Sequence, residues 1–140
     1  EGPHLKIYEA TCGRLVTKER VFDNQRIHSI KLYDSNFGTR VIVCGGRIVS
    51  VLNVQNNESS SKIQAITEVS FSDWIWDICL LQGTTEDSQC VAVVTGHNAV
   101  WIWNFNENKM WQVSQCEEQC ILYPFQLNEF CVYSKFKFLT

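Results

Sequence analysis

Short apolar runs separated by polar turn residues cover most of the chain. The runs are five to eight residues long and are rich in Val, Ile, Trp, Phe and Tyr, which suit a pleated surface. No segment of useful length shows the spacing of apolar positions that marks an amphipathic helix. The pattern predicts an all-β protein with strands at residues 5–10, 27–33, 40–44, 48–54, 63–69, 75–81, 90–95, 100–105, 110–114 and 120–127.

The strand pattern repeats along the chain. The string RIHSIKLYD, which begins at Arg26, aligns with WIWDICLLQ, which begins at Trp74. The string VIVCGGRIVSVLNV from Val41 aligns in the same way with VAVVTGHNAVWIWNF from Val91, with one residue added in the turn. The offsets lie between about 46 and 51 residues, which is close to the period of a β-propeller blade. We therefore predict blades of four antiparallel strands.

The repeat divides the chain into four parts. We expect residues 1–25 to supply one or more strands of a preceding blade, and residues 26–73 and 74–119 each to form a repeat. Residues 120–140 are expected to begin a further blade or to form a divergent tail. Because the chain opens EGPHLKIYEA and has no initiator Met, we expect it to be a piece of a longer protein.

One hairpin has the pattern of a known repeat. The string TGHNAVWIWN resembles the hairpin between the second and third strands of a WD repeat, whose third strand ends in Trp-Asp. Trp103 and Asn104 take that place here, with Asn for Asp. Together, RIHSI, DWIWDICLL, VAVVTGHNAVWIWNF and CEEQCILY resemble the N-terminal WD repeats of the WD repeat-containing protein 6 family, over roughly residues 26–123.

This resemblance implies both a fold and a function. The fold is a WD-repeat β-propeller fragment of about two to three blades. The function is that of a non-catalytic scaffold and regulator in the cytoplasm, which supports an FtsJ-type methyltransferase in 2'-O-methylation of the wobble nucleotide of tRNA. The implied partners are that methyltransferase, which carries S-adenosylmethionine, and tRNA. The alternative is a general WD-repeat protein-interaction module in signalling or trafficking, without RNA.

Seven residues form the expected repeat signature, and we interpret them as structural. Three of them fall where the chain reverses between strands, and there Asn suits the left-handed conformation that such turns need. The histidine of this turn has no neighbouring acid or orienting carboxylate, so we expect no catalytic role for it. The aspartate is expected to accept hydrogen bonds from a neighbouring loop, because a buried carboxylate needs partners. The signature residues are Gly96, His97, Asn98, Trp103, Asn104, Trp76 and Asp77.

Charge and cysteine content narrow the choice of chemistry. A net charge of -3 gives no long-range attraction for a phosphate backbone, so any RNA binding must depend on local features. The seven cysteines include no C-x-x-C pair and predict reduced thiols instead of a disulfide framework. Cys116 and Cys120 have the spacing of half a zinc site, but the second half is missing, and we expect no metal. No apolar run is long enough to span a membrane.

The remaining candidates are also better explained by structure than by catalysis or cofactor binding. The string CGGR at Cys44 is followed by a predicted strand, whereas glycine-rich phosphate loops need a following helix. Glu68, Asp73 and Asp77 lie near one another in the sequence and could supply a pair of catalytic carboxyl groups. Such a pair needs an apolar site that raises the pKa of one carboxyl group, and the sequence assigns that role to none of them. The tryptophans, including Trp76, are expected in the core. Trp74 and Trp111 are the exceptions, because they fall near strand ends and on an outer strand.

Overall fold

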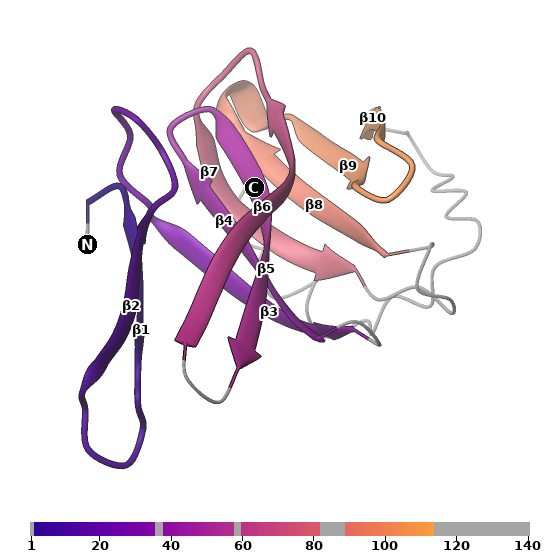
Figure 1. The fold of residues 1–140 in the computed structure, drawn as a ribbon. Coiled ribbons are helices and arrows are strands. Elements are labelled where there is room, and N and C mark those ends of the chain that lie inside the picture. Colours follow the sequence, from indigo (N-terminus) through magenta and orange to yellow (C-terminus); the bar gives the residue numbers. More distant parts are fainter. Residues whose placement is uncertain (1, 36–37, 58–59, 82–88, 114–140) are drawn as a thin grey trace. The chain divides into compact units, whose positions relative to one another are not determined.

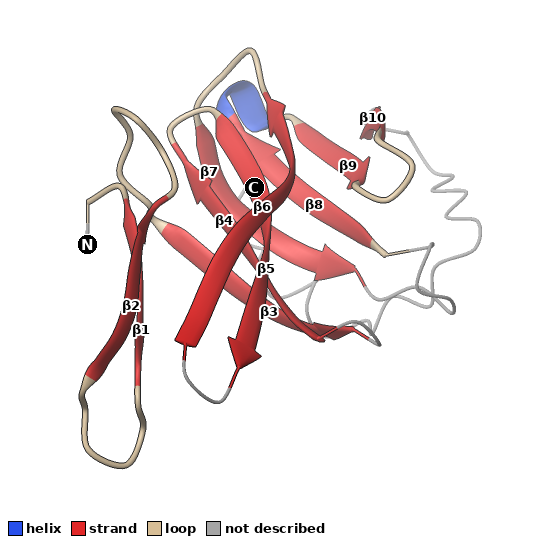
Figure 2. Ribbon diagram, in the orientation of Figure 1, coloured by secondary structure: helices blue, strands red, loops and turns tan. Residues whose placement is uncertain are grey.

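The described part of the chain is built almost entirely from strands (Figures 1 and 2). The computed structural model describes residues 2–35, 38–57, 60–81 and 89–113. Their strands form one two-stranded sheet and two four-stranded antiparallel sheets. The all-β class and the four-stranded antiparallel blades predicted from the sequence are confirmed. No helix in the described ranges is long and apolar enough to cross a membrane.

The first four-stranded sheet contains β3 (Ser29–Ser35), β4 (Gly38–Gly45), β5 (Ile48–Asn57) and β6 (Ser60–Ser70). The strands follow one another across the sheet in chain order, which is the simplest antiparallel meander. Val41 lies opposite Leu52 in the register of β4 and β5. Every residue of β4 from Val41 to Gly45 is buried, so this strand lacks the polar alternation of a sheet with one wet face.

The second four-stranded sheet contains β7 (Ile75–Leu81), β8 (Cys90–Thr95), β9 (Val100–Asn104) and β10 (Lys109–Val113). Its strands again follow chain order. The short 3-10 turn η2 (Gly96–Asn98) joins β8 to β9. A cluster of buried apolar residues holds this sheet together and consists of Leu81, Cys90, Ala92 and Ile102, with Cys79 packed against it.

An N-terminal hairpin packs on the first sheet. Its strands are β1 (His4–Tyr8) and β2 (Leu15–Arg20). Leu5 from β1 and Phe22, just after β2, are buried in one cluster with residues of the sheet, namely Val41, Val43, Leu52, Val54 and Ile63. The sequence pattern did not predict β2, because LVTKER begins with two apolar residues and ends with three charged ones. Tertiary contact and pairing with β1 stabilise this strand despite its weak apolar pattern.

The chain divides into two compact units, Glu1–Asp77 and Ile78–Thr140. The strands of the first sheet fall inside the predicted repeat 26–73, and those of the second fall inside 74–119. The β1–β2 hairpin falls inside residues 1–25, which were expected to supply strands of a preceding blade. The limits of the repeats themselves stay a prediction. The strand predicted at 120–127 and the segment 120–140 lie outside the described residues.

Candidate functional site

The turn between β8 and β9 is closed around His97. The backbone N–H of Thr95 donates to the carbonyl of Ala99 at 2.9 Å, and the Ala99 N–H donates to the Gly96 carbonyl at 3.4 Å. His97 has φ 57° and ψ 27°, in the left-handed region. The turn chemistry predicts this conformation at Asn98, but the residue that adopts it is His97. Like Asn and Asp, His is found in this region several times more often than most residues, so the turn needs no glycine there.

The end of β9 shows what Asn104 does in place of the Asp of a WD repeat. Asn104 is buried, and its Oδ1 accepts the backbone N–H groups of Asn106 and Glu107, each at 3.0 Å. An amide oxygen is therefore a sufficient acceptor for this turn. Asn53, at the aligned place in the first repeat, buries its Oδ1 without a hydrogen-bond partner within the described ranges.

Trp103 is the largest of the fully buried side chains. Its indole meets the ring of Phe105 edge-on, with 6.0 Å between the ring centroids. Trp76, by contrast, was expected in the core and is 66% exposed. Strand alternation directs the buried Ile75 and the exposed Trp76 to opposite faces of β7, and β7 is an edge strand of its sheet. Trp74 and Trp111, the two expected exceptions, are both about half-exposed, at 49% and 42%.

Asp77 accepts a hydrogen bond from the other repeat. The Ser29 Oγ donates to Asp77 Oδ1 at 3.0 Å. Ser29 and Asp77 occupy the same place in the two aligned strings, because Ser29 follows Arg26 by three residues and Asp77 follows Trp74 by three. The donor therefore comes from a strand of the preceding repeat and not, as predicted, from a neighbouring loop. Ser29 and Asp77, which are equivalent in the two aligned strings, thus meet through their side chains.

Next to this bond lies a cysteine and histidine pair that sequence reasoning missed. The Cys44 Sγ lies 3.4 Å from His28 Nε2, and the His28 ring stacks on Trp74 with centroids 5.8 Å apart and planes 12° apart. Burial, together with the negative charge of Asp77, raises the pKa of Cys44 to about 12. The thiol therefore stays protonated near neutral pH and cannot serve as a nucleophile. We interpret the pair as a structural contact.

Cys12 gives a test of this interpretation. It is exposed, whereas Cys44 and Cys90 are buried and burial raises their pKa to about 12 and about 11. A pKa near 12 instead of 9.0 leaves about a thousandfold less thiolate for alkylation. A brief treatment of the folded chain with iodoacetamide at pH 8 is expected to label Cys12 and to leave Cys44 and Cys90 unlabelled, as read by peptide mass mapping. Comparable labelling of Cys12 and Cys44 would contradict the buried position of β4.

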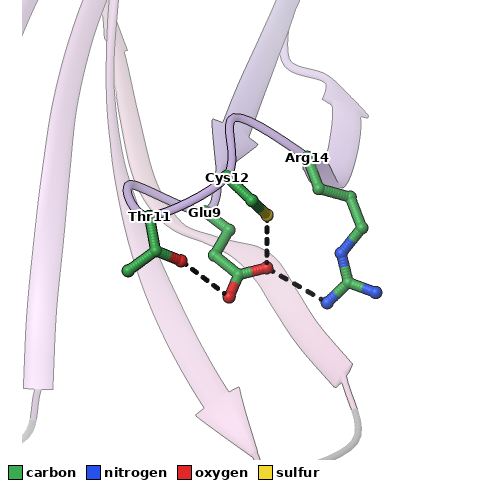
Figure 3. Close-up of polar contacts among 4 residues, drawn as sticks. All are labelled: Glu9, Thr11, Cys12 and Arg14. Atoms are coloured by element: carbon green, nitrogen blue, oxygen red, sulfur yellow. Dashed lines mark hydrogen bonds and ion pairs between the residues drawn. The ribbon is translucent and has the colours of Figure 1, made fainter.

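The turn that contains Cys12 is ordered by the Glu9 carboxylate (Figure 3). The Glu9 carboxylate accepts hydrogen bonds from the Cys12 thiol and the Thr11 hydroxyl, each at 3.1 Å. It also forms an ion pair with Arg14 at 3.2 Å. These contacts lower the pKa of Glu9, and the hydrogen bond from Cys12 has the largest effect. They close the turn between β1 and β2 on the protein's surface. The arrangement is local and exposed, and we assign it a structural role.

Within the described ranges, no group of three or more His, Cys, Asp or Glu side chains lies close enough together to hold a metal ion. Cys116 and Cys120, which have the spacing of half a zinc site, lie outside those ranges.

Comparison with known proteins agrees with the fold. No family model matches the chain. The mouse tRNA (34-2'-O)-methyltransferase regulator WDR6 is 26% identical over 132 residues, which cover 87% of this chain and 11% of that protein. The chain therefore spans about a ninth of the length of this curated relative. The crystal structure of the WD40 domain of SCAP from fission yeast superimposes with a TM-score of 0.65, at 10% identity, over 82% of this chain and 28% of that one.

The structural similarity shows a WD40 fold, and the sequence similarity is to a WDR6 regulator. The two four-stranded antiparallel sheets of this chain agree with that fold. The chain is therefore a WD-repeat β-propeller fragment similar to the WDR6 regulator.

Proposed function

We propose that this chain contributes to a non-catalytic regulatory scaffold that supports an FtsJ-type methyltransferase in 2'-O-methylation of the wobble nucleotide of tRNA, in the cytoplasm. The observation that carries the proposal is the 26% identity to the mouse methyltransferase regulator across 87% of the chain. The WD40 fold supports the coarser part of it, because propellers present binding surfaces for other macromolecules. In this proposal the partner performs the chemistry and binds the S-adenosylmethionine.

The surface of the first unit supports a scaffold role. Leu32 on β3 is 70% exposed, Trp76 is 66% exposed and Trp74 is 49% exposed. Large apolar side chains and tryptophan in particular are the residues that dominate the energy of protein interfaces. A chain with these residues in solvent is suited to be covered by a partner.

Co-purification tests the proposal. An affinity-tagged protein that contains this chain, recovered from cell extract, is expected to bring down an FtsJ-type methyltransferase together with tRNA, read by mass spectrometry and RNA sequencing. The matched control is the Trp103→Ala variant, which is expected to lose both because the second sheet loses its largest core residue. Cytoplasmic location is tested by imaging the same tagged protein.

A protein-interaction module without RNA is the second candidate. The net charge of -3 and the exposed apolar residues favour it, since neither feature attracts a phosphate backbone. A stable complex that lacks both the methyltransferase and tRNA would support this candidate and would overturn the first.

A further inference from the structure

Three segments of the first unit meet at one end of its four-stranded sheet, beside the turn between β4 and β5. The backbone of Arg26 packs against Gly45, since a Cβ added to Gly45 would lie 2.5 Å from the Arg26 carbonyl oxygen. The Arg47 N–H donates to Gln25 Oε1 at 3.3 Å. The Arg47 carbonyl accepts the Phe71 N–H at 2.8 Å. These contacts hold the three segments together at one corner of the sheet.

A stack of two aromatic rings lies at this corner. The His28 ring stacks on Trp74, with 5.8 Å between the ring centroids and 12° between the planes. The His28 N–H donates to the Cys44 carbonyl at 3.0 Å and its Nε2 lies 3.4 Å from Cys44 Sγ, so the ring is held in place. His28 covers one face of the indole, yet Trp74 is 49% exposed, which leaves room for another flat ring to stack on it. A second indole, that of Trp76, is 66% exposed.

Two exposed arginines, Arg26 and Arg47, belong to the same corner. Within the described ranges, neither guanidinium forms an ion pair or a hydrogen bond. Asp73, the acid beside the stack, accepts the Trp74 N–H at 2.7 Å instead of pairing with an arginine. Each guanidinium can therefore bind one phosphate through two parallel N–H groups. The surface that we call the aromatic corner consists of Arg26, His28, Arg47, Trp74 and Trp76.

The aromatic corner has little net charge, because carboxylates lie near its arginines. Asp23 precedes Arg26 by three residues, and Asp73 and Asp77 flank the two tryptophans in the sequence. The energy of binding must therefore come mainly from stacking, and loss of one stacked ring typically weakens nucleic-acid binding about 5- to 150-fold. An acidic peptide would be repelled by these carboxylates and would leave the stack unused. Single-stranded RNA, with a flat base beside each phosphate, is the better match.

We infer that the aromatic corner binds single-stranded RNA by stacking a base on Trp74, with Arg26 and Arg47 on neighbouring phosphates. This inference rests on the proposed tRNA role and names the surface that would carry it. It is compatible with the net charge of -3, which requires any RNA binding to depend on local features. The sequence marked Trp74 as an exception among the tryptophans but gave no sign of its ring partner, because His28 belongs to the preceding repeat.

Truncation of Trp74 tests the stacking contact. Binding of the full 140-residue chain to a fluorescein-labelled single-stranded RNA of about 16 nucleotides is measured by fluorescence anisotropy at several salt concentrations. Trp74→Ala is expected to weaken binding on the order of tenfold without changing the slope of log K against log salt. Trp74→Phe keeps a flat ring beside His28 and is expected to retain affinity within about threefold. The matched control is Trp111→Ala, which removes another half-exposed indole, on β10, and is expected to change affinity less than about twofold.

Neutralisation of Arg47 tests the phosphate contact. Arg47→Gln is expected to reduce the salt slope by about 0.7, the value for one phosphate of a single strand. The hydrogen bonds that Arg47 makes to Gln25 and Phe71 use its backbone, so the substitution leaves them in place. The matched control is Arg14→Gln in the turn between β1 and β2, where Arg14 pairs with Glu9, and it is expected to leave the slope unchanged.

Melting temperatures of the variants separate binding from folding. Trp74→Ala and Arg47→Gln are expected to melt within about 5 °C of the unmodified chain, because both side chains are at least half-exposed. Should Trp74→Ala melt far below this, the salt slope of Arg47→Gln decides, and an unchanged slope there would overturn the inference.

Three further results would overturn the inference. They are equal losses of affinity in Trp74→Ala and Trp111→Ala, absence of RNA binding by the unmodified chain, and equally good competition by inorganic polyphosphate, which carries the charge of RNA without its bases. None of them alters the recovery of the methyltransferase in the co-purification test, so the two proposals fail separately.

Discussion

Trp103→Ala is expected to lower the free energy of unfolding by about 3 to 5 kcal/mol, the usual loss for truncating a buried tryptophan. Trp103 is 0% exposed and contacts the ring of Phe105, so the change removes a large packed surface and leaves a cavity in the second unit. A loss of this size is a large part of the roughly 5 to 15 kcal/mol that stabilises an ordinary domain. Urea unfolding followed by circular dichroism measures it.

Trp111→Ala is the matched control for Trp103→Ala. Trp111 lies on β10, the edge strand of the same sheet, and is 42% exposed, so its truncation is expected to cost less than about 1.5 kcal/mol. Equal costs at the two positions would show that burial does not distinguish them and that the position of Trp103 in the second unit is wrong.

Gly45→Ala is expected to destabilise the first unit by about 3 kcal/mol, at the upper end of the cost of overpacking. A Cβ at this position would lie 2.5 Å from the carbonyl oxygen of Arg26 and 2.9 Å from the ring of Phe22. Arg26 lies two residues before His28, whose backbone N–H donates to the Cys44 carbonyl. The Arg26 carbonyl therefore cannot move away without breaking the end of the sheet. The free energy of unfolding in urea measures the effect.

Gly13→Ala provides the comparison that isolates the cause. Gly13 has φ +69° and nothing within 4 Å of the added Cβ, so its substitution is expected to cost only about 1 kcal/mol, for the left-handed backbone alone. Gly45 has no such backbone constraint, and its larger cost would come from the close approach of the chain. A greater loss at Gly13 than at Gly45 would contradict this explanation.

The repeat was predictable from the sequence because it depends on local patterns. Aligned strings such as VIVCGGRIVSVLNV and VAVVTGHNAVWIWNF place the same apolar positions and the same tight turn in both repeats. Inner strands that are buried on both faces are apolar throughout, so the sequence alone predicts them. The nine predicted strands in the described ranges therefore correspond to β1 and β3–β10, with shifts of one or more residues at several ends.

The candidate surfaces were much less predictable, because they depend on contacts between residues that are distant in the sequence. The Ser29 bond to Asp77 spans 48 residues, and the His28 contact with Cys44 spans 16. Trp76 was expected in the core because its strand is apolar, yet it is 66% exposed. Periodicity shows which residues alternate along a strand but does not show which side of an edge strand another element covers.

The sequence by itself therefore determined the class of fold, the four-stranded repeat and the resemblance to WD repeats, since strand propensity, alternation and turn chemistry act over a few neighbouring residues. The tertiary structure alone decided which residues meet. It paired β2 with β1 although LVTKER has a weak strand pattern, and that pairing brought Lys6 and Lys18 onto one face. Leu5 packs against the first sheet, and this long-range contact decides which face of the hairpin is buried.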